Sequence, residues 1–201
     1  STHWAYFNFD RAQLDANIGV VNGSGTLHSG RDSDGNIGTA GQATGTTLRN
    51  SRLVQVFYDS NDGDVRYEIL SVENNTLSPV LSDQNIDTSV GSASRVAAVE
   101  IESEGNSNFL AAWQDLDSGT LRGAVYNSGG TEVAAPFSIS DNPSTSFLLF
   151  DAVGFNSILD FGLCDQKFAV AYVNSSDVLR LDTFVENGNT WNGLCTPDIT
   201  G

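Results

Sequence analysis

Hydrophobic residues recur along this chain in short runs that are separated by polar turns. The clearest unit has four such runs, RVAAVEI, NFLAAWQ, TLRGAVY and APFSIS, between residues 95 and 140. Each run is rich in Val, Phe, Tyr or Ile and is bounded by Asp, Asn, Ser or Gly, which is typical of β-strands joined by tight turns. No window sustains the i, i+3, i+4 spacing of an amphipathic helix. The pattern predicts an all-β fold of short antiparallel strands.

This unit is repeated. The stretch LVQVFYDSNDGDVRYEIL from Leu53 aligns without a gap with FLAAWQDLDSGTLRGAVY from Phe109, and FAVAYVNSSDVLRLDTFV from Phe168 aligns after one deletion. An aromatic residue recurs at one position of the alignment and an arginine at another. The aromatic residues are Phe57, Trp113 and Tyr172, and the arginines are Arg66, Arg122 and Arg180.

A threonine at the end of a second turn sets the period of the repeat. The turns NGSGT, VENNT, NSGGT and ENGNT end at residues 26, 76, 131 and 190. A period of about 55 residues indicates blades or arrays, and four antiparallel strands per repeat make one β-propeller blade. We therefore expect a single all-β domain over residues 1–201, propeller-like, with about four blades of four strands and an incomplete first blade. The approximate repeats are 1–30, 39–83, 87–141 and 147–201, and a β-sandwich is the alternative fold.

The unit NFLAAWQDLDSGTLRGAVYNSGGTEVAAPFSIS resembles the blade-like repeats of large secreted bacterial surface proteins. The resemblance is clearest over residues 106–141 and weaker elsewhere. It implies a β-propeller that binds glycans, calcium or other surface components, and it brings no catalytic residues with it.

The charge balance excludes some partners. There are 25 acidic residues and 9 basic residues, which give a formal net charge of -16. A body this acidic repels phosphate backbones and anionic lipid surfaces, so we expect neither nucleic-acid nor membrane-surface binding. No apolar run approaches the length of about 18 residues that a membrane-spanning helix needs.

The cysteines and sequons favour an extracellular location. Cys164 and Cys195 have too few candidate metal ligands nearby in sequence, so we favour a disulfide over a metal site, with two buried thiols as the alternative. A disulfide implies an oxidising compartment, and hence a secreted or cell-surface protein. Asn22, Asn74 and Asn174 begin Asn-x-Ser/Thr sequons and are possible glycosylation sites.

One acidic turn has the spacing of a calcium loop. In DSDGNIG, Asp32, Asp34 and Asn36 occupy alternate positions, from which successive side-chain oxygens can converge on a calcium ion. The match is partial because the distal bidentate glutamate of an EF-hand is missing. The alternative is that Asp, Asn and Gly are simply the residues that tight turns use.

The recurring arginines have two interpretations. Arg66, Arg122 and Arg180 could form a ring of guanidinium groups that holds a carboxylate or a sugar. Alternatively, each arginine clamps its own hairpin, with Arg66 paired to Asp59 and Arg122 to Asp115.

Aromatic residues could also contact sugar rings. Trp191 is a candidate sugar platform, and its turn ENGNTWNG is similar to the structural turns of sialidase-type blades. Trp113 and Tyr172 lie in apolar strands, where we expect them in the core.

These features favour a secreted, non-enzymatic binding or adhesion module that recognises a surface glycan, with calcium as a possible cofactor. The first alternative is a structural subunit of an extracellular filament, ring or surface layer, in which unpaired edge strands join copies into a homo-oligomer or polymer. The second alternative is a glycosidase, since that chemistry needs only two carboxylates. No nucleophile elbow or phosphate-binding loop is present in the sequence.

Overall fold

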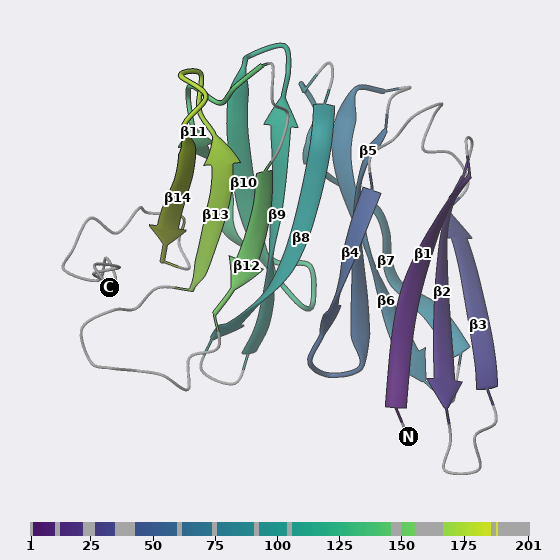
Figure 1. Ribbon diagram of the computed structural model, residues 1–201. Helices are drawn as coiled ribbons and strands as arrows, with labels where there is room; N and C mark the ends of the chain where they lie inside the picture. Colours follow the sequence, from purple (N-terminus) through teal and green to yellow (C-terminus); the bar gives the residue numbers. More distant parts are fainter. Residues whose placement is uncertain are drawn as a thin grey trace.

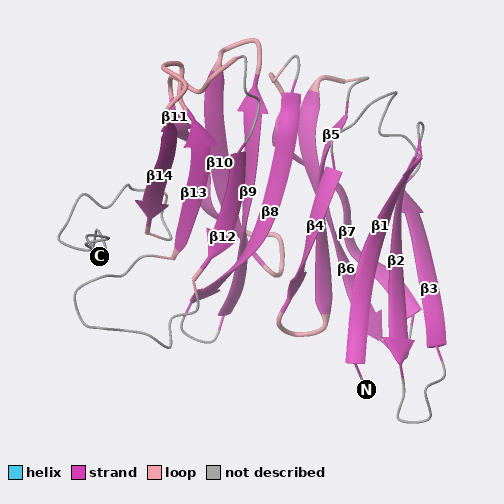
Figure 2. Cartoon of the chain, viewed as in Figure 1, coloured by secondary structure: helices cyan, strands magenta, loops and turns pink. Residues whose placement is uncertain are grey.

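The structure is a computed structural model of the chain. It describes residues 2–10, 13–21, 27–34, 43–59, 62–73, 76–90, 93–103, 106–145, 150–155, 167–185 and 188. Within these residues the regular elements are all strands, and none is a helix (Figure 2). The prediction of an all-β fold is confirmed.

The strands form four antiparallel sheets, and in each sheet the strands are adjacent in chain order. The first sheet contains β1 (Thr2–Asp10), β2 (Gln13–Val21) and β3 (Leu27–Asp34). The second contains β4 (Ala43–Leu48), β5 (Arg52–Asp59), β6 (Asp64–Glu73) and β7 (Thr76–Asp87). The third contains β8 (Ala93–Ser103), β9 (Asn106–Asp115), β10 (Thr120–Asn127) and β11 (Glu132–Ser140). The fourth contains β12 (Phe150–Gly154), β13 (Phe168–Val173) and β14 (Leu179–Phe184).

The four sheets follow one another across the molecule from the N-terminal end to the C-terminal end (Figure 1). The first strands of successive sheets are in contact, β1 with β4, β4 with β8, and β8 with β12. Each sheet therefore packs on the next one, as the blade-like repeats predicted. The second sheet continues to Asp87, beyond residue 83, where the sequence repeat was expected to end.

The strand register reproduces the alignment of the repeats. Three pairs of residues lie directly opposite each other across the second and third strands of their sheets. These pairs are Phe57 with Arg66, Trp113 with Arg122, and Tyr172 with Arg180. The aromatic and arginine positions that recur in the sequence are therefore structurally equivalent.

Among the residues whose side chains the structure describes, two clusters of buried apolar side chains lie between sheets. One cluster, between the second and third sheets, contains Val54, Val56, Phe109 and Trp113 among others. The other cluster, between the third and fourth sheets, contains Leu110, Val125, Phe168 and Phe184 among others. The side chain of Trp113 is fully buried and that of Tyr172 is 8% exposed, so the expectation that both belong to the core is confirmed. Because β9 contributes alternate side chains to both clusters, the third sheet is buried on both faces.

A glycine allows the third and fourth sheets to approach closely. A Cβ atom built on Gly154 would lie 1.7 Å from the backbone oxygen of Glu100, on the neighbouring β8. Backbone atoms cannot move aside as a flexible side chain can, so this contact between β8 and β12 requires glycine.

We expect Gly154→Ala to lower the free energy of unfolding by about 2 kcal/mol or more, because it pushes two backbones apart. The control is Gly119→Ala, at a turn glycine with a φ of +67° where an added Cβ meets nothing within 4 Å. That change costs only the backbone strain, about 1 kcal/mol. Urea unfolding of both variants measures the difference, and equal losses would show that the close approach is unimportant.

Candidate functional site

The three recurring arginines lie at the equivalent place on the third strand of their sheets. Arg66 is on β6, Arg122 on β10 and Arg180 on β14. Each is opposite an aromatic residue and shares that residue's face of the sheet, the face toward the preceding sheet. The partners of the three guanidinium groups nevertheless differ.

Arg66 is enclosed by carboxylates. Its guanidinium nitrogens lie 3.4 Å from Asp59, 2.5 Å from Asp62, 3.1 Å from Asp64 and 2.9 Å from Asp83. Burial opposes the charge of Arg66, but hydrogen bonds to Asp83 and Asp64 outweigh it and raise the pKa of the guanidinium above its ordinary value. The pair with Asp59 is the hairpin clamp that the sequence predicted. Four carboxylates already contact the two terminal nitrogens of Arg66 and its Nε is buried, which leaves little of the guanidinium for a ligand.

Arg122 has a different partner from the one expected. It pairs with Asp87 at 2.5 Å, and its guanidinium carbon lies 5.7 Å from the centre of the Trp113 ring. Asp115, the expected partner, instead accepts hydrogen bonds from the backbone nitrogens of Asp117 and Ser118 in its own turn. The reason is geometric: a carboxylate at the start of a tight turn is within reach of the turn amides, which it caps. Arg122 therefore joins the third sheet to the end of β7 in the second sheet.

Arg180 is exposed on β14, opposite Tyr172. The Tyr172 hydroxyl donates a hydrogen bond to Asp182 at 2.8 Å. Burial is the main cause that raises the pKa of Tyr172, and the charge of Arg180 acts in the opposite direction. The three arginines thus occupy one repeat position in three different environments: enclosed, half-buried and exposed.

We expect Arg66→Met to destabilise the fold by about 2 kcal/mol, because it leaves Asp59 and Asp64, 5% and 7% exposed, without their cation. Arg122→Met is the matched control, since it removes the same charge from a single ion pair and keeps an apolar side chain beside Trp113. Urea unfolding at neutral pH should show the larger loss for Arg66→Met. A larger loss for Arg122→Met would contradict this account of the cluster.

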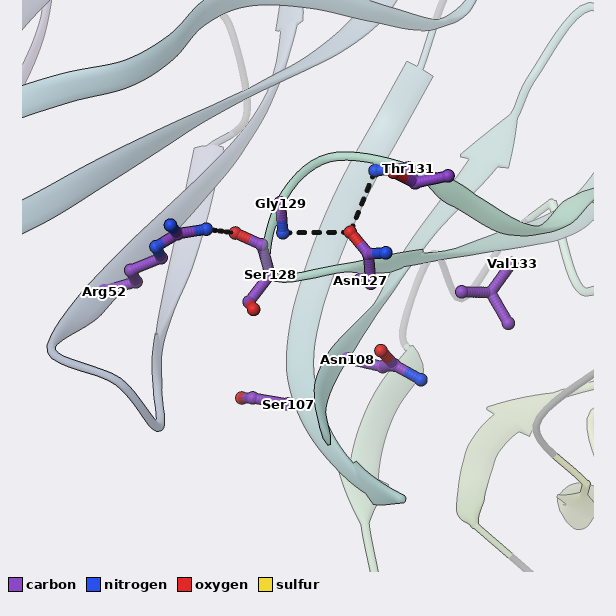
Figure 3. A pocket seen from close by; sticks show the side chains of 8 residues that line it. All are labelled: Arg52, Ser107, Asn108, Asn127, Ser128, Gly129, Thr131 and Val133. Atoms are coloured by element: carbon purple, nitrogen blue, oxygen red, sulfur yellow. Dashed lines mark hydrogen bonds between the residues drawn. The ribbon is translucent and has the colours of Figure 1, made fainter. Parts of the chain in front are cut away.

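A polar pocket of about 420 Å³ lies where the second and third sheets meet. Its lining comes from β5, from the start of β9, and from the turn that joins β10 to β11 (Figure 3). The lining residues are Arg52, Ser107, Asn108, Asn127, Ser128, Gly129, Thr131 and Val133. The volume falls within the range of small-molecule binding sites, about 300 to 1,000 Å³.

The turn that forms one wall of the pocket is held by Asn127. The Asn127 side-chain oxygen accepts hydrogen bonds from the backbone nitrogens of Gly129 and Thr131, both at 2.9 Å (Figure 3). The backbone oxygen of Asn127 accepts a third from the Gly130 nitrogen at 2.9 Å. Gly130 has a φ of +84°, which favours glycine, and a Cβ atom there would lie 2.0 Å from Leu81. The oxygen of the Asn127 amide is thus engaged in the turn, and Asn127 itself is one of the pocket residues.

The same turn is bonded to the second sheet. The Tyr67 hydroxyl donates to the Gly130 backbone oxygen at 3.0 Å, and Arg52 donates to the Ser128 backbone oxygen. On the other wall, the Ser107 hydroxyl donates to Glu100 at 2.6 Å and accepts from the Arg49 backbone nitrogen at 3.1 Å. Both walls of the pocket therefore depend on contacts between two consecutive sheets.

The chemistry of the lining suits a neutral, polyhydroxylated ligand. Amides and hydroxyls offer donors and acceptors together, Arg52 adds charged donors, and Val133, 41% exposed, adds an apolar surface. Arg52 is the one ionisable side chain among the eight, so these residues hold no acid and base pair for catalysis. In the sequence, the turn NSGGT indicated only the period of the repeat. The Asn-Ser-Gly-Gly sequence of that turn was the signal that could have indicated the pocket wall.

Other residues singled out from the sequence have these positions. Asp32 and Asp34 lie within strand β3, paired with Ala16 and Leu14, where a turn was expected. Asn174 begins the turn between β13 and β14, and its side-chain oxygen accepts from two backbone nitrogens. The remaining candidates lie outside the described residues: Asn22, Asn36, Asn74, Cys164, Trp191 and Cys195.

The described ranges lack both a metal-binding cluster and a membrane-spanning helix. No group of three or more His, Cys, Asp or Glu side chains is arranged there to hold a metal ion. The same part of the chain contains no helix that is long and apolar enough to cross a bilayer.

An aromatic cluster adjoins the pocket turn through Tyr67, whose hydroxyl donates to the Gly130 backbone oxygen. Tyr67 lies 4.9 Å from Tyr126 and 5.5 Å from Phe109, between ring centres. Burial, together with the charge of Glu132, raises the pKa of Tyr126 from 10.0 to about 12. The pKa of Tyr67 is raised by the same causes. Both phenols are therefore favoured in their neutral form by the fold.

Stability should fall as the pH rises through this range. Between pH 10 and about 12 the native state keeps the Tyr126 proton that the unfolded chain releases, so a contribution that is complete below pH 10 is lost by pH 12. We expect Tyr126→Phe to show a smaller drop in Tm between these two pH values than the natural chain. An identical drop in both proteins would show that Tyr126 does not contribute to the alkaline loss.

Stacked antiparallel meanders whose first strands meet in succession define a β-propeller-like protein. The solved structure of a mutant lectin of Aleuria aurantia, in complex with α-methyl-L-fucoside, is similar to this chain with a TM-score of 0.58. That lectin has a β-propeller fold. The likeness covers 94% of this chain and 54% of the lectin, at 16% sequence identity, so it shows the fold. This chain therefore spans about half the length of the lectin. No family model and no curated protein matches the sequence.

Proposed function

We propose that this chain is a non-enzymatic carbohydrate-binding module, made of about four propeller blades, that acts outside the cell. The observation that carries the proposal is the lining of the pocket between the second and third sheets. It combines neutral donors and acceptors with one guanidinium and one exposed apolar side chain. Sugars present hydroxyl groups that both donate and accept, beside apolar C–H faces, and this lining is complementary to that surface.

The fold supports the same proposal. The similar solved structure is a lectin bound to a fucoside, and a binding site at a junction of two sheets suits a scaffold in which function resides in turns held by a rigid framework. The rigidity is visible in the turn at Asn127, which is fixed by its own hydrogen bonds and by bonds to the second sheet. A turn that is already ordered has less conformational entropy to lose when a ligand binds.

The charge of the chain narrows the class of sugar. With a formal charge of -16, the protein repels anionic glycans at long range. Within the pocket, Arg52 already donates one of its N–H groups to the Ser128 backbone oxygen, so fewer of its donors remain for an anion. We therefore favour neutral sugars over sialylated or sulfated ones.

A glycan array that contains neutral and acidic sugars, followed by calorimetric titration with α-methyl-L-fucoside, tests the proposal. We expect binding to a subset of neutral glycans. A flat response across the array would overturn it.

The variant Asn127→Asp tests the location of the site. It keeps the side-chain oxygen that holds the turn and removes the amide donor from the pocket, so we expect affinity for the array hit to fall at least about tenfold with little change in Tm. Asn174→Asp is the matched control, because Asn174 holds its own turn through the same kind of bonds, from the nitrogens of Ser176 and Val178, and does not line the pocket. Equal binding by both variants would place the site elsewhere.

A further inference from the structure

The outer face of the fourth sheet carries several exposed apolar side chains among the described residues. Leu179 is 71% exposed, Leu181 61% and Val153 51%. The strand register places Leu181 beside Ala171, and Leu179 beside Val173, on the face opposite to Tyr172 and Phe184, which pack toward the third sheet. Large apolar side chains grouped on one face of a sheet are typical of an interaction surface.

The repeat shows what such a face does elsewhere in the molecule. Leu121 in the third sheet and Leu179 in the fourth occupy equivalent positions, each directly before the recurring arginine. Leu121 is 1% exposed because it is buried against the fourth sheet, whereas Leu179 is 71% exposed. At this position the fourth sheet therefore has the same residue that the third sheet uses to pack on the sheet after it.

The charge of this face favours a second copy of the chain. Its eight residues include one carboxylate and no cation: Asp151, Val153, Ala169, Ala171, Val173, Leu179, Leu181 and Thr183. Two copies that each carry a net charge of -16 repel each other over most of their surfaces. This face contributes one carboxylate to that repulsion, and its exposed apolar side chains can be buried against a partner. A partner of opposite charge would find almost nothing here to bind.

The length of the similar lectin points in the same direction. The stack of sheets in this chain corresponds to 54% of the lectin chain, so a chain with a similar stack is about twice as long as this one. A sheet face of this kind accommodates another sheet at a spacing of about 10 Å.

We propose that the outer face of the fourth sheet is a self-association surface, on which a sheet of a second copy packs through Leu179, Leu181 and Val153. The surface is distinct from the pocket and does not depend on carbohydrate binding. Self-association would also present several pockets at once, and several weak sites acting together bind a glycan-bearing surface more tightly than one.

Sedimentation velocity over a roughly hundredfold range of protein concentration tests the proposal. We expect the natural chain to sediment as a dimer or larger species, and the double variant Leu179→Asp, Leu181→Asp to sediment as a monomer. The control is Val80→Asp, which places the same charge at another exposed apolar strand residue, 38% exposed on β7. A natural chain that stays monomeric throughout would overturn the proposal, as would a double variant that associates like the natural chain.

Hydrogen exchange of the natural chain gives a second readout that needs no variant. Protection of the β14 amides should rise with protein concentration, because dilution uncovers the face. Protection that does not change with concentration would overturn the proposal, whether it results from an always exposed face or from one covered within a single chain.

Discussion

The packing of one sheet on the next is the interaction on which this structure depends. The short meanders bury little surface alone, and the side chains of the middle strands become core only when a neighbouring sheet covers each face. The third sheet is the clearest case. Phe109 and Trp113 on β9 point toward the second sheet, while Leu110 on the same strand points toward the fourth. Close approach is part of the same constraint, and Gly154 allows the backbone of β12 to lie against that of β8.

The polar turns stabilise the hairpins that the apolar strands form. Asn127 and Asn174 each close a turn through two backbone hydrogen bonds to the side-chain oxygen, and Asp115 does the same in the turn before β10. These turns explain much of the unusual composition. Acidic and amide side chains are abundant because hairpins that follow one another so closely need residues that can cap exposed backbone nitrogens. The charge of the protein is in part a consequence of its topology.

The fold could be predicted from the sequence more fully than the site. Local geometry determines the short apolar runs, their period and the recurring aromatic and arginine positions. Each repeat encodes that geometry again, so the sequence shows it several times. The alignment of Trp113 with Phe57 and of Arg122 with Arg66 was confirmed, because the register of each hairpin is fixed by its turn and places both pairs alike. The pairing of Arg122 with Asp87 could not be predicted, since it joins residues of different sheets and depends on how those sheets stack. The pocket was missed for the same reason: Arg52 and Asn127 meet only through tertiary packing.

The hydrogen bond from Tyr67 to Gly130 joins two consecutive repeats at the wall of the pocket. A site of this kind is formed at the junction of two repeats. One repeat expressed alone would therefore lack one wall of the site, and the contacts that hold the other wall would be missing. Duplication of a repeat creates a new junction as well as a new sheet, and each junction is free to change its lining without altering either core. Sites in such a protein can therefore diverge one by one while the scaffold remains constant, which gives a simple architecture access to a varied set of ligands.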